Sequence, residues 1–220
     1  VRMNTNFKEL LLNMGRSFAF AYGHKENGAM FSHMAVMFAY ALYERRETEY
    51  AYKIMHKIFE HCMNFNVSKI YPGIPEYINQ RGRGMYTYLT GSASWYILTL
   101  TTKIFGIRGQ FGDLVLDPQL IPDQFDSNRT VAIITIFNKI PLKIIYQNDK
   151  LYKPDDYQIK SIHINDHSIS YEKLDKGVLV KKSKLLVHSS NELNEIIVEL
   201  EKKKEMREKN DVYQPQISTT

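Results

Sequence analysis

The sequence has little cysteine and no long apolar run. Its single cysteine, Cys62, excludes an internal disulfide framework and leaves no cysteine pair for a zinc site. Charged residues or glycines break every apolar stretch well before 18 residues, so we expect no transmembrane helix and no membrane partner. No signal peptide is visible at the N-terminus. These features favour a soluble protein of a reducing compartment, the cytoplasm.

The charge is modest and has no pattern typical of a nucleic-acid-binding protein. The 220 residues carry a net charge of +5, and 44% of them are hydrophobic, which is enough for a substantial core. The positive excess lies in residues 1–110, whereas the second half is nearly balanced. Because Lys and Arg are scattered there and form no basic stripe, we expect no nucleic-acid partner.

Apolar spacing predicts helices in the first half of the chain. Amphipathic patterns cover residues 6–22 and 47–63, whereas residues 28–43 and 91–105 are apolar almost all round. We therefore expect outer and inner helices to alternate along the chain. The connection over residues 64–90 is rich in Pro and Gly and is longer than a simple turn, so it could contain functional residues.

The periodicity changes to two after Gly106. Short runs rich in Val, Ile and Tyr predict strands at residues 113–118, 130–137, 141–147, 157–165, 177–182 and 194–200. Residues 201–220 are strongly charged and poor in apolar side chains, which predicts a disordered tail. The predicted organisation is helices over 1–109, a β-sandwich over 110–200 and a flexible tail over 201–220.

Alternating inner and outer helices before a β-sandwich are typical of the end of an α/α barrel. The inner helices of such a barrel run parallel, so the starts of the helices at 28 and 91 would open at one end. Helix N-termini offer unpaired N–H groups and partial positive charge, which favour an anion. Both starts carry polar motifs, "ENGAMFSH" at 26–33 and "YLTGSAS" at 88–94.

Each candidate site residue has a local structural alternative. Thr90, Gly91 and Ser92 could clasp an oxyanion or form an ordinary N-cap. His33 could donate to an anion or be a satisfied buried histidine.

Other polar residues near these motifs leave the same choice open. Glu26 and Asn27 could cap a helix or accept sugar hydroxyls. Glu76, Arg81 and Arg83 could be charged groups of a site or belong to a surface loop. Aromatic residues that could contact sugar rings or simply pack in the core gather around the long connection: Tyr71, Tyr77, Tyr86, Tyr88 and Trp95.

Several ordered motifs carry a family resemblance over residues 8–125. "ENGAMFSH", "YPGIPEY", "GRGMYTYLTGSASWY" and "GDLVLDPQL", in this order and spacing, resemble the C-terminal third of glycoside hydrolase family 94. That family contains inverting oligosaccharide phosphorylases and a module of cyclic β-1,2-glucan synthase. These motifs are most similar to those of the 1,2-β-oligoglucan phosphorylases. The sequence departs from the family pattern at Ala29, where the family often has a second glycine.

The resemblance implies a fold and an activity. The expected fold class is α + β in separate domains: the C-terminal part of an (α/α)6 barrel followed by a β-sandwich of jelly-roll type. The expected reaction is attack of inorganic phosphate on a β-linked, β-1,2, glucooligosaccharide, which yields α-glucose 1-phosphate. His33, Thr90 and Gly91 would hold the phosphate, and Glu26, Asn27, Glu76 and Tyr77 would bind the sugar.

The resemblance also implies what this chain does not supply. The general acid of the family is an aspartate upstream of the Glu-Asn-Gly motif, and no residue here matches it. We therefore expect a fragment of a longer polypeptide that needs the rest of its barrel and an N-terminal β-sandwich for catalysis. Phosphate is the co-substrate, no metal or other cofactor is expected, and a homodimer is possible. The alternative is a non-catalytic carbohydrate-binding or chain-length-controlling module of a glucan synthase.

Overall fold

The computed structural model describes residues 2, 4–9, 11–18, 20–70, 73–86, 91–190 and 192–203. Its helical elements are η1 (Leu12–Phe18), α1 (Ser32–Glu44), α2 (Thr48–Met63), α3 (Phe65–Ser68), α4 (Gly91–Thr99), η2 (Leu100–Ile104), η3 (Pro122–Gln124) and α5 (Lys182–His188). Its strands are β1 (Met30–Phe31), β2 (Tyr77–Ile78), β3 (Gly84–Met85), β4 (Ile107–Gln110), β5 (Asp113–Leu116), β6 (Thr130–Phe137), β7 (Ile140–Gln147), β8 (Tyr157–Ile164), β9 (His167–Ser168), β10 (Glu172–Lys173), β11 (Val178–Val180) and β12 (Asn194–Lys202).

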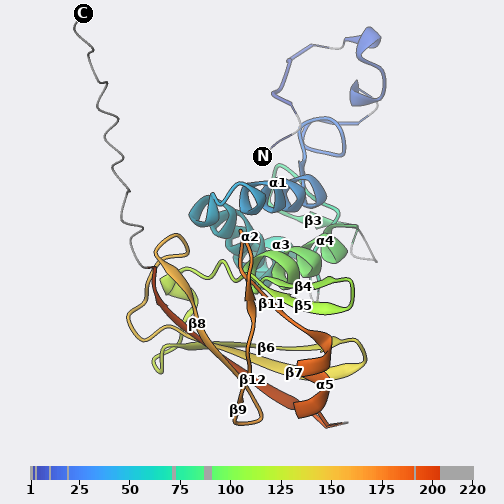
Figure 1. Cartoon of the computed structure of the whole chain (residues 1–220). Coiled ribbons are helices and arrows are strands. Elements are labelled where there is room, and N and C mark those ends of the chain that lie inside the picture. The colour runs from blue at the N-terminus through green and yellow to red at the C-terminus, as the bar shows by residue number, and fades with distance from the viewer. Residues whose placement is uncertain are drawn as a thin grey trace, which may run out of the picture.

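A helical layer lies on one side of two larger sheets (Figure 1). Helix α1 packs against α2 and α4, and its small residues Ala35 and Ala39, both buried, allow the helices to approach closely. The helices of the described residues are too short or too polar to cross a bilayer.

The (α/α)6 barrel expected from the sequence is wrong for the described residues. They form three sheets and only five short α-helices, with no closed ring of helices. The prediction that the segments 28–43 and 91–105 form inner, mostly buried helices also fails. Phe38 of α1 is 49% exposed and Ile97 of α4 is 64% exposed. Their apolar sequences indicated burial, but a single layer covers only one face of each helix.

The predicted helix over residues 6–22 is also wrong. The described part of this segment contains only the 3-10 element η1, and Gly15 interrupts it with φ 60° and ψ −133°. That conformation lies outside the helical region and is open to glycine because glycine has no side chain. The apolar spacing indicated a helix, but it does not report this break.

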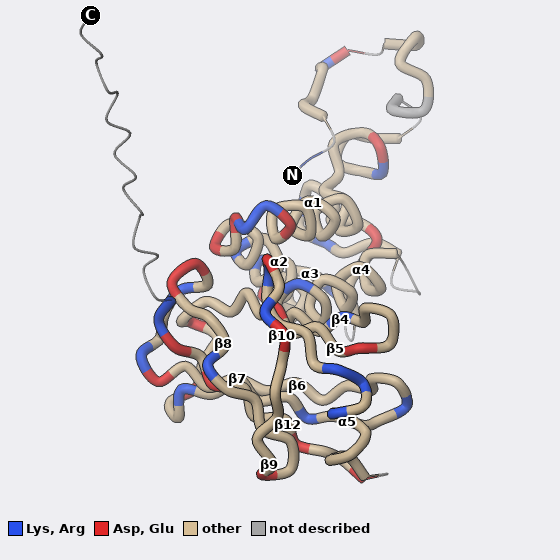
Figure 2. The backbone as a smooth tube through the Cα atoms, in the orientation of Figure 1, with Lys and Arg blue, Asp and Glu red and all other residues tan. Residues whose placement is uncertain are grey.

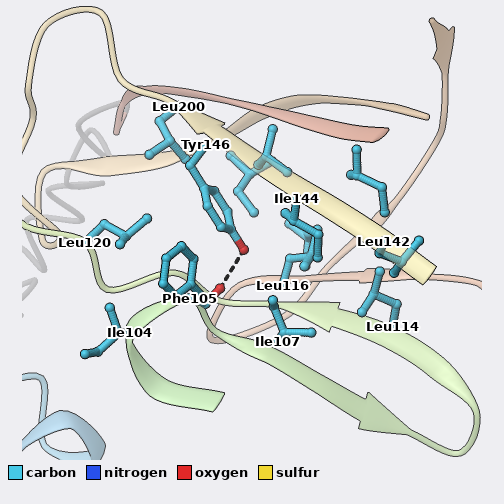
Figure 3. Close-up of a cluster of buried hydrophobic side chains, with 14 of the residues drawn as sticks. Ile104, Phe105, Ile107, Leu114, Leu116, Leu120, Leu142, Ile144, Tyr146 and Leu200 are labelled. Atoms are coloured by element: carbon cyan, nitrogen blue, oxygen red, sulfur yellow. Dashed lines mark hydrogen bonds between the residues drawn. The ribbon is translucent and has the colours of Figure 1, made fainter. Parts of the chain in front are cut away.

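The two larger sheets follow the helical layer in sequence and face each other. One has the strand order β10-β11-β5-β4 and the other β6-β7-β12-β8-β9. Side chains of β5 and β7, among them Leu114, Leu116, Leu142 and Ile144, are fully buried between them (Figure 3). The hydroxyl of Tyr146 donates a 2.6 Å hydrogen bond to the carbonyl oxygen of Phe105, which links β7 to the end of the helical layer.

Three of the strands predicted from runs rich in Val, Ile and Tyr are confirmed nearly to the residue. The predicted strand at 130–137 matches β6, that at 141–147 lies within β7, and that at 157–165 matches β8 to one residue. The last strand, β12, continues to Lys202, so residues 201 and 202 belong to the sheet. Residues 204–220 of the expected tail lie outside the described residues.

Candidate functional site

Three segments that are distant in the sequence meet at the start of α1. Strand β1 pairs with β2, so Phe31 lies opposite Tyr77. The backbone N–H of Ser32 donates to the carbonyl oxygen of Glu76 at 3.0 Å, and the Ser92 hydroxyl donates to the carbonyl oxygen of Pro75 at 3.1 Å. The "GIPEY" segment is therefore tied to the first turns of both α1 and α4.

The structure brings His33 and Gly91 into direct contact. Gly91 is the first residue of α4, and His33 is the second residue of α1. A β-carbon added at Gly91 would lie 3.0 Å from Cε1 and 3.3 Å from Nε2 of His33. The imidazole thus occupies the space that a side chain at Gly91 would fill, directly at a helix N-terminus.

Two polar atoms at this point are buried without a partner. His33 Nε2 and the Ser32 hydroxyl oxygen have no hydrogen-bond partner within the described part of the chain. Ser32 is fully buried, and such orphaned groups cost free energy unless a ligand or water satisfies them. The adjacent start of α4 adds N–H groups that have no acceptor inside the helix. The arrangement is suited to an oxyanion.

Only part of the Thr90-Gly91-Ser92 motif lies within the described residues. Thr90, expected to bind phosphate, lies outside the described residues. The Ser92 side chain is fully buried and spends its single hydroxyl proton on Pro75. Of the two roles left open for this hydroxyl, the structure shows neither directly, and Ser92 anchors α4 to the neighbouring loop.

The Glu-Asn-Gly loop is held by its own hydrogen bonds. The side-chain amide of Asn27 donates to the carbonyl oxygen of Phe20 at 2.8 Å, and its oxygen accepts from the Asn4 amide at 3.3 Å. Asn27 thus shapes the loop, because both its amide nitrogen and its amide oxygen take part in hydrogen bonds there. Glu26 is half-buried in the same loop, and Ala29, where the sequence departs from the family pattern, is fully buried.

Lys25, which sequence reasoning missed, joins the expected sugar-binding residues. Its ammonium lies 2.8 Å from Glu76 Oε2 and 3.7 Å from the centre of the Tyr86 ring. Burial is the largest single influence and opposes the positive charge, but the hydrogen bond to Glu76 and the charge attraction to Glu76, Tyr86 and Tyr77 together outweigh it and raise the pKa of Lys25. Burial raises the pKa of Tyr77, although the nearby positive charge of Lys25 acts in the opposite direction.

These side chains form a compact aromatic and charged cluster. The rings of Tyr77 and Tyr86 have centroids 5.8 Å apart, and Phe31 lies 5.6 Å from Tyr77. The His24 ring lies within 3.4 Å of the Tyr77 hydroxyl. No local spacing links Lys25 to Glu76, since 51 residues separate them, so only the fold reveals the pair.

The remaining candidates lie apart from this cluster or cannot be placed. The backbone N–H groups of Arg81 and Arg83 bond to the Asn79 side chain at 2.9 and 3.1 Å, and both arginine residues are exposed, as expected for a surface loop. Trp95 lies 6.2 Å from His33, centroid to centroid. Tyr71 and Tyr88 lie outside the described residues.

A separate polar pocket of about 290 Å³ lies where the loop after β10 approaches the sheets. Arg46 and Arg108 bind the Asp117 carboxylate at its edge, at 2.7 and 3.0 Å. Both lysine and aspartate residues line the rest of this pocket, so its charge is mixed.

Comparison with known protein-family models and with curated proteins gives no match for this chain.

Proposed function

We propose that this chain supplies the phosphate-binding site of an inverting glycoside phosphorylase, a hexosyl-transferring enzyme. Its substrates would be inorganic phosphate and a β-1,2-linked glucooligosaccharide, and its product would be α-glucose 1-phosphate. The observation that supports the proposal best is the His33 ring against Gly91 at the start of α4, with Nε2 buried and unpaired among the described residues.

The groups around His33 and the start of α4 are suited to bind phosphate. An imidazole N–H is a donor of the right size for one phosphate oxygen, and the helix start offers backbone N–H groups and partial positive charge to another. The glycine at the first helical position lets the His33 ring lie directly against the helix start, so that both kinds of donor are next to each other. Charge-assisted hydrogen bonds of this kind are about twice as strong as neutral ones.

The cluster beside it suits the sugar. Tyr77 and Tyr86 offer ring faces to a pyranose, and Glu76 offers carboxylate oxygens to its hydroxyls. The ion pair with Lys25 holds Glu76 in one orientation. These residues would place the glycosidic carbon next to the bound phosphate.

In the proposed reaction a phosphate oxygen bonds to the anomeric carbon as the glycosidic C–O bond breaks on the opposite face. His33 and the α4 start would orient the nucleophile and balance its charge. The leaving oxygen takes a proton from an acid, which we do not assign to any residue of this chain. The proposal therefore covers binding and positioning by these residues, and a cytoplasmic site of action suits the single, buried Cys62.

Titration calorimetry with inorganic phosphate tests this proposal. His33→Ala should raise the dissociation constant about ten- to hundred-fold, because a charge-assisted hydrogen bond contributes about 1.5–3 kcal/mol. His167→Ala is the matched control, since His167 is an exposed histidine on β9, and it should bind phosphate as the unmodified chain does. Equal affinity in the His33 and His167 variants would refute the phosphate site.

The cluster of Tyr77 and Tyr86 also favours the second candidate, a carbohydrate-binding module without phosphate chemistry. The two candidates differ in a second titration, with β-1,2-glucooligosaccharide in place of phosphate. A module would bind the sugar and show no phosphate binding, whereas the phosphorylase site would bind phosphate in a His33-dependent manner.

A further inference from the structure

Strand β6 forms an open edge of the five-stranded sheet. It pairs with β7 on one side, residue for residue over all eight positions and without a bulge. On its other side, only the backbone of Thr130 is bonded, to Asp126, among the segments that the structure describes. Half of the remaining peptide N–H and C=O groups of β6 therefore point outward, as in any edge strand.

This edge lacks the protection that the other edges of the larger sheets have. Natural sheets protect their edges with short strands, charges, prolines or bulges. Strands β9 and β10 are two residues long and polar, and β4 carries Arg108 and Gly109. In contrast, β6 reads "TVAIITIF", with no charge, no proline and no glycine, and its tube carries no charged residue in Figure 2.

Apolar surface remains uncovered on both faces of β6. On the outer face Ile134 is 68% exposed and Ile136 is 73% exposed. On the inner face Ile133 is only half-buried, although Ile144, its neighbour on β7, is fully buried. One further strand would cover side chains on both faces and pair the outward peptide groups.

We infer that a second copy of this chain pairs with β6, antiparallel and about a two-fold axis near Ile134. In such a pair each strand lies beside the same sequence running in the opposite direction. A charged residue near the axis would therefore lie close to the same charge of the partner and be repelled by it. Strand β6 avoids this because it is uncharged throughout. With Ile134 on the axis, Ala132 lies opposite the partner's Ile136 and Val131 opposite the partner's Phe137, an aromatic and β-branched pair that favours sheets.

The resulting dimer joins two five-stranded sheets into one continuous sheet. This inference goes beyond the proposed function and does not depend on phosphate binding, because β6 contributes no residue to the site around His33.

Sedimentation velocity over a range of concentrations tests the dimer. The unmodified chain should show a monomer–dimer equilibrium, and Ile134→Lys should raise its dissociation constant about ten-fold or more, because two ammonium groups meet at the axis. Val187→Lys on α5, an equally exposed apolar site at 74%, should leave the equilibrium unchanged. A chain that stays monomeric at every attainable concentration would overturn the inference.

Two further variants keep the test decisive. Ile134→Cys should form an intermolecular disulfide on mild oxidation, whereas Val187→Cys should not, and the native Cys62 is buried. Met37→Lys changes the exposed face of α1 instead. A dimer that is lost in Met37→Lys but persists in Ile134→Lys, or an Ile134→Cys chain that does not cross-link, would show that β6 is not the interface.

Discussion

At the scale of single residues, the contact between His33 and Gly91 separates binding from stability. A methyl group at Gly91 would lie 3.0 Å from His33 Cε1, closer than carbon atoms normally approach, so the ring must move. The backbone itself tolerates alanine, which forms helices better than glycine by about 1 kcal/mol. Gly91→Ala should therefore weaken phosphate binding about ten-fold while the melting temperature stays equal or rises.

A double mutant identifies the cause of that loss. If Gly91→Ala acts by displacing the imidazole, combining it with His33→Ala should weaken binding no further than His33→Ala alone. Additive losses in calorimetry would show that Gly91 acts independently of His33.

The sequence indicated one contact of the candidate site. The expectation that the starts of the two apolar helices lie at one end rested on an α/α barrel, which is wrong for the described residues, but the structure does bring His33 and Gly91 together. Lys25 was missed because its partner Glu76 lies 51 residues away, and nothing local marks such a pair. The use of Ser92 as an anchor for Pro75 was equally invisible, since a cap, an anchor and an anion ligand require the same hydroxyl.

At the scale of elements, Gly106 controls the passage from the helical layer to β4. Its φ of +67° lies in the left-handed region, and an added β-carbon would lie 2.0 Å from the carbonyl oxygen of Asp117. Gly106→Ala should therefore lower the free energy of unfolding by about 3 kcal/mol or more, from backbone strain and overpacking together.

Gly109→Ala, on the same strand, is the matched control for this change. Its β-carbon would meet the Phe137 ring at 3.5 Å, an ordinary contact. Chemical denaturation should show a small effect at Gly109, and a similar loss at both positions would contradict the role given to Gly106.

The elements also show where sequence patterns are reliable. Runs rich in β-branched residues between turn residues predicted the bounds of β6 and β7 nearly to the residue, because such side chains favour strands. The apolar sequence of α1 correctly predicted a helix, but it wrongly predicted that the helix is buried. The apolar pattern of a helix shows which side chains can be buried. It does not show whether the described chain provides other elements that cover them.

At the scale of the whole molecule, helices and sheets share one hydrophobic core. The buried cluster runs from Val36 of α1 through Phe105 to Tyr146 of β7 without interruption. Polar links cross the same boundary, such as the Thr48 hydroxyl to Gln119 at 3.0 Å. We expect the helical layer and the sheets to unfold together in a single transition.

Two probes test this cooperativity. Fluorescence of Trp95, the single tryptophan, reports the helical layer, and the strand band in the infrared spectrum reports the sheets. Their thermal midpoints should coincide, and two separated midpoints would show that the layers unfold independently.

The proposed binding of phosphate by His33 at the start of α4 can be observed at the imidazole itself. Nitrogen NMR of the imidazole rings during a phosphate titration is the most direct measurement, because each of the seven histidines reports separately. We expect a saturable shift of the His33 ring nitrogens, with His167 unchanged. No shift at His33, or equal and unsaturable shifts at all histidines, would contradict it.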